Sequence, residues 1–173
     1  MPSRFMFRAA AAATLVTLSA LALGAAASNH GSRVGGTFTM TYTQRNPTPL
    51  TDAEGHVLLQ TASTGTNQST GPTSYMAGAV TTSSELADLV QGNGTHQGYV
   101  TMSLNGELSV TQWSGTISTV LGPDQKPVTS FKGKWIEVRG PSGQGTYSGR
   151  ITGPDSYSVD WQGEIDLKAT ASR

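Results

Sequence analysis

Residues 156–167 read SYSVDWQGEIDL, and this stretch decides the fold class. Large or apolar side chains and one glycine occupy every second position from Tyr157 to Leu167, and polar side chains fill the positions between them. Such alternation is typical of a β-strand with one face in a core and the other in water. The polar face carries Asp160, Glu164 and Asp166, which we expect to be solvated and to have Lys132 and Lys134 as cross-strand partners.

Strands and turns alternate backward from this stretch through the second half of the chain. Alternating or β-rich segments predict strands at 98–104, 107–121, 128–138 and 146–152. Turn residues separate them, of which Asn105-Gly106 is the strongest hairpin signal because both residue types tolerate a positive φ. The second half therefore predicts a run of antiparallel strands.

Four of these strands repeat an aromatic residue followed two positions later by glycine. The repeats are Trp113-Ser-Gly115, Phe131-Lys-Gly133, Tyr147-Ser-Gly149 and Trp161-Gln-Gly163. Residues two apart on a strand share a face, so a ring can cover the glycine of a neighbouring strand where a coiled sheet bends. The same rings are also candidates for a ligand cage, and the sequence leaves both interpretations open.

The first half is less regular. Alternation predicts a strand at 35–43, ended by Asn46-Pro47-Thr48-Pro49, because proline cannot donate to a β-ladder. Further strands are predicted at 56–63 and, more weakly, at 74–81, with a polar loop at 64–72 between them. Residues 82–91 predict one short helix, since Thr82 and Glu85 fit a capping box and Leu86, Leu89 and Val90 form an apolar stripe.

These segments predict an all-β domain at 35–168, an eight-stranded antiparallel up-and-down barrel with one short helix. Residues 28–34 and 169–173 are expected to be flexible ends. At eight strands a barrel interior is either filled by side chains or just wide enough for one small ligand.

The first 27 residues have the layout of a secretory signal peptide. Arg4 and Arg8 precede an apolar stretch at 9–23, and Ala25-x-Ala27 supplies a cleavage site, so we expect a secreted or periplasmic protein. Without the leader, 9 basic and 11 acidic residues remain, a net charge of −2, which argues against nucleic-acid partners. No later segment is apolar enough to predict membrane insertion. The chain has no cysteine, which excludes disulfides and thiolate chemistry.

The strand and glycine pattern resembles the allene oxide cyclase barrel-like proteins, especially their secreted bacterial members of unknown function. The residues that carry the resemblance are His96-Gln-Gly-Tyr-Val100, Trp113-Ser-Gly115, Phe131-Lys-Gly-Lys-Trp135 and Gly145-Thr-Tyr-Ser-Gly149, within residues 35–168. The resemblance implies an eight-stranded barrel, compatible with a homo-oligomer, with an apolar cavity open at one end. Members with known activity cyclise or isomerise hydrophobic substrates. None of their catalytic residues can be placed on this sequence.

No known catalytic motif occurs, so candidate residues come from strand parity. If Phe131 and Trp135 point inward, Glu137 and Arg139 do too, and His96 shares the face of Val100. Glu137 and His96 are therefore weak candidates for a general acid or base. The structural alternative, which we favour, is that Glu137 pairs with Arg139 at the barrel rim and His96 caps a loop. The candidate ligand-binding residues are Trp113, Phe131, Trp135, Tyr147, Trp161 and Arg139. The histidine spacing predicts no metal site, and no cofactor is expected.

Three functions stay open on the sequence. The first is an exported barrel that binds a small apolar molecule, and the second is a cyclase or isomerase that uses the same cavity. The third is a structural, envelope-associated protein whose barrel is filled. The volume of the interior separates the third function from the other two.

Overall fold

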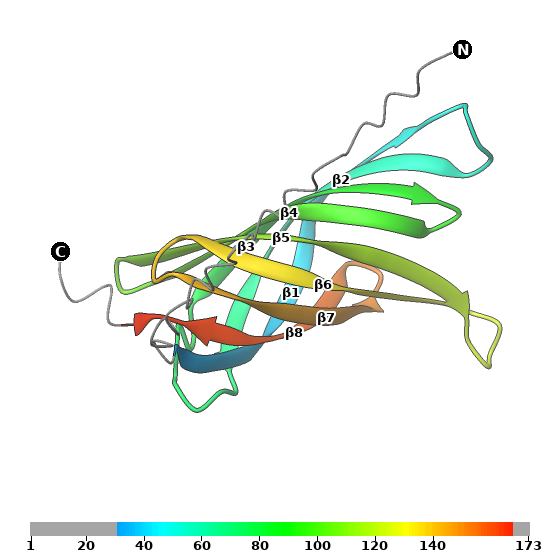
Figure 1. Ribbon diagram of the computed structural model, residues 1–173. Helices are drawn as coiled ribbons and strands as arrows, with labels where there is room; N and C mark the ends of the chain where they lie inside the picture. The colour runs from blue at the N-terminus through cyan, green and yellow to red at the C-terminus, as the bar shows by residue number, and fades with distance from the viewer. Residues whose placement is uncertain (1–30, 168–173) are drawn as a thin grey trace, which may run out of the picture.

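The structure of the protein is a computed structural model that describes residues 31–167, and the predicted signal peptide and C-terminal tail lie outside this range. Eight antiparallel strands follow one another around a closed barrel, as predicted (Figure 1). The strands are β1 (Ser32–Pro49), β2 (His56–Ser69), β3 (Val80–Val90), β4 (Asn93–Leu104), β5 (Glu107–Leu121), β6 (Pro127–Arg139), β7 (Gly143–Gly153) and β8 (Ser156–Ile165).

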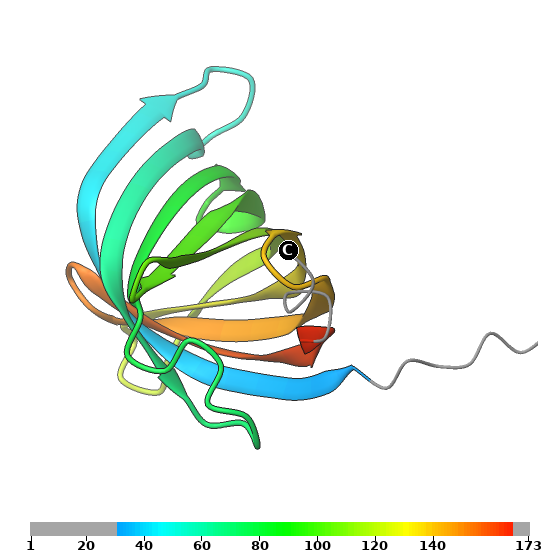
Figure 2. The same cartoon turned by 90° about the vertical axis from the view of Figure 1, so that its left-hand side faces the viewer.

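The two ends of the barrel differ. At one, here called the hairpin end, short connections join β1 to β2, β3 to β4, β5 to β6 and β7 to β8. At the other, here called the terminal end, β1 begins, β8 ends and residues 70–79 connect β2 to β3. Figure 1 shows the β1–β2 and β5–β6 hairpins extending at the hairpin end on the right, and Figure 2 views the barrel from the terminal end.

The inward face predicted for β8 is confirmed. Tyr157, Val159, Trp161 and Ile165 are all buried, with Ile165 only 1% exposed, whereas Leu167 lies beyond the strand and is exposed. The outer face includes Asp160, whose carboxylate accepts a hydrogen bond from Thr37 on β1. Lys132 and Lys134 on β6 pair with β7, which lies between β6 and β8, so they are not cross-strand partners of the β8 acids.

The aromatic–glycine pairs of neighbouring strands are also confirmed. The register sets Trp113 opposite Gly98, Phe131 opposite Gly149 and Tyr147 opposite Gly133. A Cβ built on Gly98 would lie 2.8 Å from the Trp113 ring, and one on Gly133 would lie 2.5 Å from the Tyr147 hydroxyl. The rings thus occupy the space that a side chain would need at these glycines, which covers the bent backbone.

The predicted helix at 82–91 is wrong, because these residues belong to strand β3. The strand pairs along its whole length with β2 on one side and β4 on the other, and a helix would leave both of those edges unpaired. The apolar stripe misled the prediction because two of its three residues, Leu86 and Val90, face outward, while Leu89 faces the interior. Leu86 and Val90 are 46% and 41% exposed, whereas Ala87 is fully buried. The helical spacing of apolar residues in this segment is thus outweighed by the backbone hydrogen bonds that close the barrel.

The predicted strand at 74–81 is also wrong, since most of it belongs to the connection 70–79. Met76 adopts a positive φ of 51°, and both Met76 and Ala79 are buried in the core. The Asn67 side-chain amide donates to the Met76 carbonyl at 2.8 Å, and the Gly78 amide donates to the Asn67 carbonyl at 2.8 Å. This connection therefore packs into the terminal end of the barrel.

Strands β1 and β2 are longer than predicted. β1 starts at Ser32 with Val34 buried, so the expected flexible end is already part of the sheet from that residue on. It also continues through Pro47 and Pro49, which pair with β2 beyond the last residue that pairs with β8. Because the Leu50 amide donates toward β2, the alternate positions Pro47 and Pro49 face the unpaired side, where no amide donor is needed. β2 extends to Ser69 through the expected polar loop.

Within residues 31–167 there is no helix long and apolar enough to cross a membrane.

Candidate functional site: the barrel interior

The barrel encloses a cavity of about 330 Å³. This volume lies at the small end of the range of roughly 300–1,000 Å³ that is usual for small-molecule sites. Aromatic and aliphatic side chains form most of its lining, and a few polar groups interrupt them. At the terminal end Tyr75 and Glu137 line it, and toward the hairpin end Leu59, Leu89 and Thr119 do so. The interior is therefore not completely filled by side chains.

Five of the six predicted ligand-binding residues line this cavity, namely Trp113, Phe131, Trp135, Tyr147 and Trp161. The sixth, Arg139, is exposed and does not line it. The β5–β6 ladder is irregular between Val110 and Thr111: Glu137 pairs with inward-facing Thr111, but Arg139 pairs with Val110. A shift of one residue moves a side chain to the opposite face of a sheet, so parity no longer places Arg139 inside.

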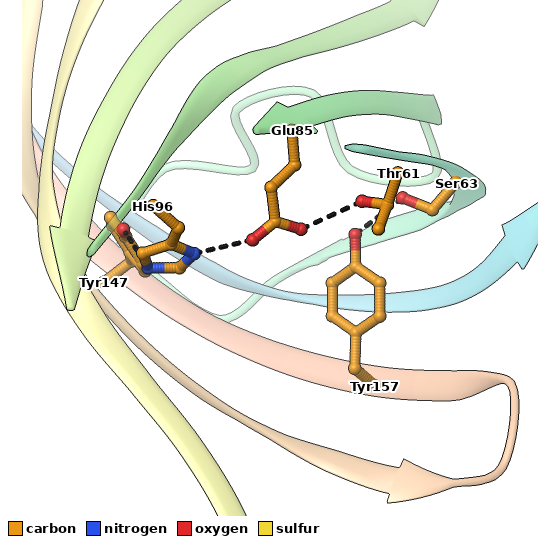
Figure 3. Close-up of polar contacts among 6 residues, drawn as sticks. All are labelled: Thr61, Ser63, Glu85, His96, Tyr147 and Tyr157. Carbon is orange, nitrogen blue, oxygen red and sulfur yellow. Dashed lines mark hydrogen bonds and ion pairs between the residues drawn. The ribbon is translucent and has the colours of Figure 1, made fainter. Parts of the chain in front are cut away.

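A chain of polar side chains runs along β2, β3 and β4 and reaches across the interior to β7, as Figure 3 shows in part. Glu85 on β3 accepts hydrogen bonds at both carboxylate oxygens. Oε1 lies 2.8 Å from His96 Nδ1 on β4, and Oε2 lies 3.0 Å from the Thr61 hydroxyl on β2. His96 Nε2 in turn lies 3.0 Å from the Tyr147 hydroxyl on β7. Four strands thus contribute to one continuous network.

The two central side chains of this network are largely buried. The His96 side chain is 3% exposed and that of Glu85 is 13% exposed. With Glu85 ionised, the Nδ1–H group of His96 donates to Oε1, which leaves Nε2 as an acceptor for the Tyr147 hydroxyl proton. His96 therefore lies between a carboxylate and a phenol, with its edge against the Trp113 ring at a centroid distance of 4.8 Å. The expectation that His96 caps a loop is therefore wrong, because His96 lies within strand β4.

The phenols of the interior are held in their protonated form. Burial raises the pKa of Tyr147, and the negative charge of Glu85 raises it further. Burial also raises the pKa of Tyr157, although a hydrogen bond with Ser63 at 2.6 Å acts in the opposite direction. Both hydroxyls therefore keep their protons at neutral pH and can donate hydrogen bonds, and neither is a resting phenolate.

Glu137 lies at the terminal end of the cavity. The Ser109 hydroxyl donates to its Oε1 at 2.7 Å, and the Thr111 hydroxyl donates to its Oε2 at 3.0 Å. Burial raises the pKa of the Glu137 carboxyl, although these two hydrogen bonds partly counteract the effect. Within residues 31–167 no Lys, Arg or His forms an ion pair with Glu137, so the expected pair with Arg139 does not form.

Two buried polar atoms of the cavity lining have no hydrogen-bond partner in the described part of the protein. They are the Tyr75 hydroxyl oxygen and Trp113 Nε1. The other two tryptophans are satisfied, since Trp135 Nε1 donates to the Gln162 carbonyl and Trp161 Nε1 donates to the Asn67 side chain. Buried polar groups almost always have a partner. A molecule inside the cavity can supply the partners that these two atoms lack.

Sequence reasoning missed Glu85 and Tyr75. Glu85 was assigned to a helix cap, and the period-two series Thr81, Ser83, Glu85, Ala87 and Leu89 was the signal that placed it on the inner face of a strand. Tyr75 belongs to a connection, where no periodicity shows which way a side chain points. Among residues 31–167 no three or more His, Asp or Glu side chains are arranged to bind a metal ion.

Comparisons of the chain with protein-family models, with curated proteins and with solved structures find no match.

Proposed function

We propose that this protein is an exported binding protein that holds one small, mainly apolar molecule inside its barrel. The observation that carries the proposal is the cavity of about 330 Å³, lined largely by aromatic and aliphatic side chains. Sites of this kind combine an apolar lining with a few polar groups that orient the ligand. Trp113 Nε1 and the Tyr75 hydroxyl are such groups, because each lines the cavity and lacks a protein partner.

The cavity also weighs against a filled structural barrel. Filled cores reach the packing density of organic crystals and contain few voids larger than a water molecule. A void of this size forfeits the packing contacts that its lining residues would otherwise make. An occupant restores those contacts.

The test uses the mature protein and a neutral fluorescent probe, N-phenyl-1-naphthylamine, whose emission rises in apolar surroundings. We expect saturable binding with one probe per chain. Ile117→Phe adds bulk to the cavity lining and should weaken binding at least about tenfold, which corresponds to about 1.4 kcal/mol. Ser118→Phe adds the same ring to the outer face of the same strand and should leave binding unchanged. Equal affinity for both variants, or no saturable binding at all, contradicts the proposal.

Native mass spectrometry of the protein exported through its own leader identifies the natural occupant. A retained mass of a few hundred daltons, well above a water or buffer ion, supports the binding function. The same spectrum reports the cleavage site and the number of subunits.

A second candidate function is a proton-transferring isomerase or cyclase that uses the same cavity. It rests on the ordered chain from Glu85 through His96 to Tyr147, in which His96 Nε2 can accept a proton while Glu85 stabilises the resulting imidazolium. An isomerisation of this kind removes a proton from one carbon of the substrate and returns one to another, so it needs no redox partner.

Deuterium exchange separates binding from isomerisation. Once the occupant is identified, it is incubated with the protein in D₂O and recovered. A catalysed proton transfer introduces deuterium at carbon, and His96→Gln should abolish that exchange. A simple binding protein returns the ligand without deuterium at carbon.

A further inference from the structure

At the terminal end of the cavity, two hydrogen-bond acceptors line the wall without a positively charged side chain beside them. Glu137 presents a carboxylate there, with the Tyr75 hydroxyl beside it in the lining. Burial raises the pKa of Tyr75 to about 12, the Ser109 hydroxyl acts in the opposite direction, and the negative charge of Glu137 raises it further. Ser109 also donates to Glu137, so Tyr75 and Glu137 share this neighbour. Both groups can accept a hydrogen bond from a ligand, and neither has a positively charged neighbour among residues 31–167.

No other side chain that lines the cavity balances the charge of Glu137. His96 binds the other acid of the cavity, Glu85, which also accepts a hydrogen bond from Thr61. Arg45, which also lines the cavity, stacks on the Tyr42 ring at 3.9 Å and forms an ion pair with Asp155 at 3.7 Å near the hairpin end. Arg139 points to the outside of the barrel. The half-buried carboxylate accepts hydrogen bonds from the Ser109 and Thr111 hydroxyls and from the Val110 backbone amide, and none of these donors carries a positive charge.

Aromatic rings surround the same end. Trp135 lies two residues before Glu137 on β6 and forms an edge-to-face pair with Trp161 at 6.0 Å. Trp113, the register partner of Trp135, lies two residues after Thr111 on β5. Rings of this kind attract a cation through the negative potential of their faces. A carboxylate with two tryptophans at the next inward positions of its own and the paired strand therefore favours a positively charged ligand group and disfavours an anionic one.

We propose that the molecule held in the barrel is an apolar amine whose protonated nitrogen binds at Glu137 and the Tyr75 hydroxyl. The ammonium donates to the free acceptor positions of these two groups, and its hydrocarbon part fills the space between Trp113, Phe131 and Val100. This inference rests on the proposed binding function, because it names the chemical class of the ligand for the same cavity. Buried charges are normally paired, and the ammonium supplies the missing partner of Glu137.

The test compares two probes of equal size, 2-phenylethylamine and 2-phenylethanol, by displacement of N-phenyl-1-naphthylamine at neutral pH. In the unmodified protein we expect the amine to bind at least about tenfold more tightly than the alcohol. Glu137→Gln should reduce this preference to less than about threefold while it leaves the alcohol affinity in place. Glu164→Gln, which removes an acid from the outer face of β8, should leave the tenfold preference intact.

Each outcome decides between the two proposals. If the amine and the alcohol displace the dye equally well, or if Glu137→Gln keeps the preference, the amine inference is overturned and the binding function stands. If the dye does not bind at all, both proposals fail. Should Glu137→Gln not fold, the amine–alcohol ratio in the unmodified protein still decides, and Tyr75→Phe, which removes only the second acceptor, should lower that ratio severalfold.

Discussion

The inside of this barrel has two walls that are built on different principles. The aromatic wall, formed by β5 to β8, consists of Trp113, Phe131, Trp135, Tyr147 and Trp161, most of them set against glycines of neighbouring strands. The polar wall, formed by β2 to β4, consists of Thr61, Ser63, Thr81, Ser83, Glu85 and His96. The first is held by steric fit between rings and bare backbone, and the second by hydrogen bonds between buried polar groups.

This difference shows that one barrel can combine a wall held by ring packing with a wall held by hydrogen bonds. On the aromatic wall a ring occupies space that any other side chain would need, so the structure tolerates little change there. On the polar wall Thr61, Ser63, Glu85 and His96 each bond to a side chain from another strand, and the loss of one partner leaves the other unsatisfied. The predictions below test the two walls against each other.

The largest effect is expected on the aromatic wall, from Gly133→Ala. The new Cβ would lie well inside contact distance of the Ser114 carbonyl oxygen and 2.5 Å from the Tyr147 hydroxyl, and the backbone cannot move away without breaking the ladder. We expect a loss of about 3 kcal/mol in the free energy of unfolding, measured by urea denaturation.

Gly122→Ala is the control, because the two atoms nearest its new Cβ belong to side chains, at 3.1 and 3.2 Å. It should cost less than about 1 kcal/mol. A Gly133→Ala variant as stable as the Gly122→Ala variant would show that close ring packing does not define the aromatic wall.

The next effect is expected on the polar wall, from Glu85→Ala. This change leaves the His96 Nδ1–H group and the Thr61 hydroxyl without an acceptor in a buried position, at a cost of about 2–3 kcal/mol. Glu85→Gln keeps an acceptor for His96 and should cost less than about 1 kcal/mol. Thermal unfolding of both variants provides the comparison, and equal losses would mean that volume and not hydrogen bonding governs this wall.

Tyr157→Phe probes the place where the two walls meet. Its hydroxyl bonds to Ser63 at 2.6 Å across the interior, so its removal leaves a buried serine unpaired at a cost of about 1 kcal/mol. Tyr99→Phe removes a hydroxyl from an exposed tyrosine and should change nothing measurable. No difference between the two variants would show that the walls are not joined at this point.

A smaller, pH-dependent effect is expected at the hairpin end, beyond the polar wall. His56 lies between two carboxylates, with Nδ1 2.7 Å from Asp52 and Nε2 2.7 Å from Asp88. Hydrogen bonds to Asp88 and Asp52 raise the pKa of His56 above its ordinary value of 6.5. The folded chain therefore binds this proton more tightly than the unfolded chain does. The resulting stabilisation is complete below pH 6.5 and is lost as the pH rises through the folded pKa.

Asp52 shows the opposite dependence, because its hydrogen bond with His56 lowers its pKa below the ordinary 3.8. Its contribution to stability is present above pH 3.8 and is lost as the pH falls through the lowered pKa.

The test for His56 is the melting temperature, measured from about pH 5 to about pH 9. It should fall more steeply with rising pH in the unmodified protein than in the His56→Gln variant. Parallel curves would rule out a protonated His56 as the link between the β1–β2 hairpin and β3.

The smallest effect is expected on the outer face of β3. Leu86 is 46% exposed, so Leu86→Gln should change stability by no more than about 0.5 kcal/mol. Ala87→Gln, at the next residue, inserts a polar side chain at a fully buried position and should cost more than about 2 kcal/mol. Chemical denaturation of the pair tests whether β3 turns its polar side inward, and a reversed order would contradict it.

The aromatic wall and the polar wall also differ in how far the sequence predicted them. The ends of β5, the inward face of β8 and the glycines opposite the rings all followed from local alternation and turn residues. These features depend on neighbours in sequence or on the adjacent strand. In β3 the usual strand pattern of apolar residues inside and polar residues outside is reversed at Glu85, which faces inward, and Leu86, which faces outward. The apolar residues of this segment therefore lacked a two-residue period and indicated a helix. Only pairing with β2 and β4 shows that the segment is a strand.

The sequence by itself determined an all-β barrel and located seven of its eight strands, and it gave the aromatic–glycine pairing of the second half and the presence of His96 and Glu137 on the inner face. These conclusions depend on the two-residue period of a strand, which any segment carries alone. The tertiary structure alone decided the partnership of Glu85 with His96, the outward turn of Arg139 and the contribution of Tyr75 to the cavity. Those outcomes depend on register, on an irregular ladder position and on a packed connection, which arise only when distant strands meet.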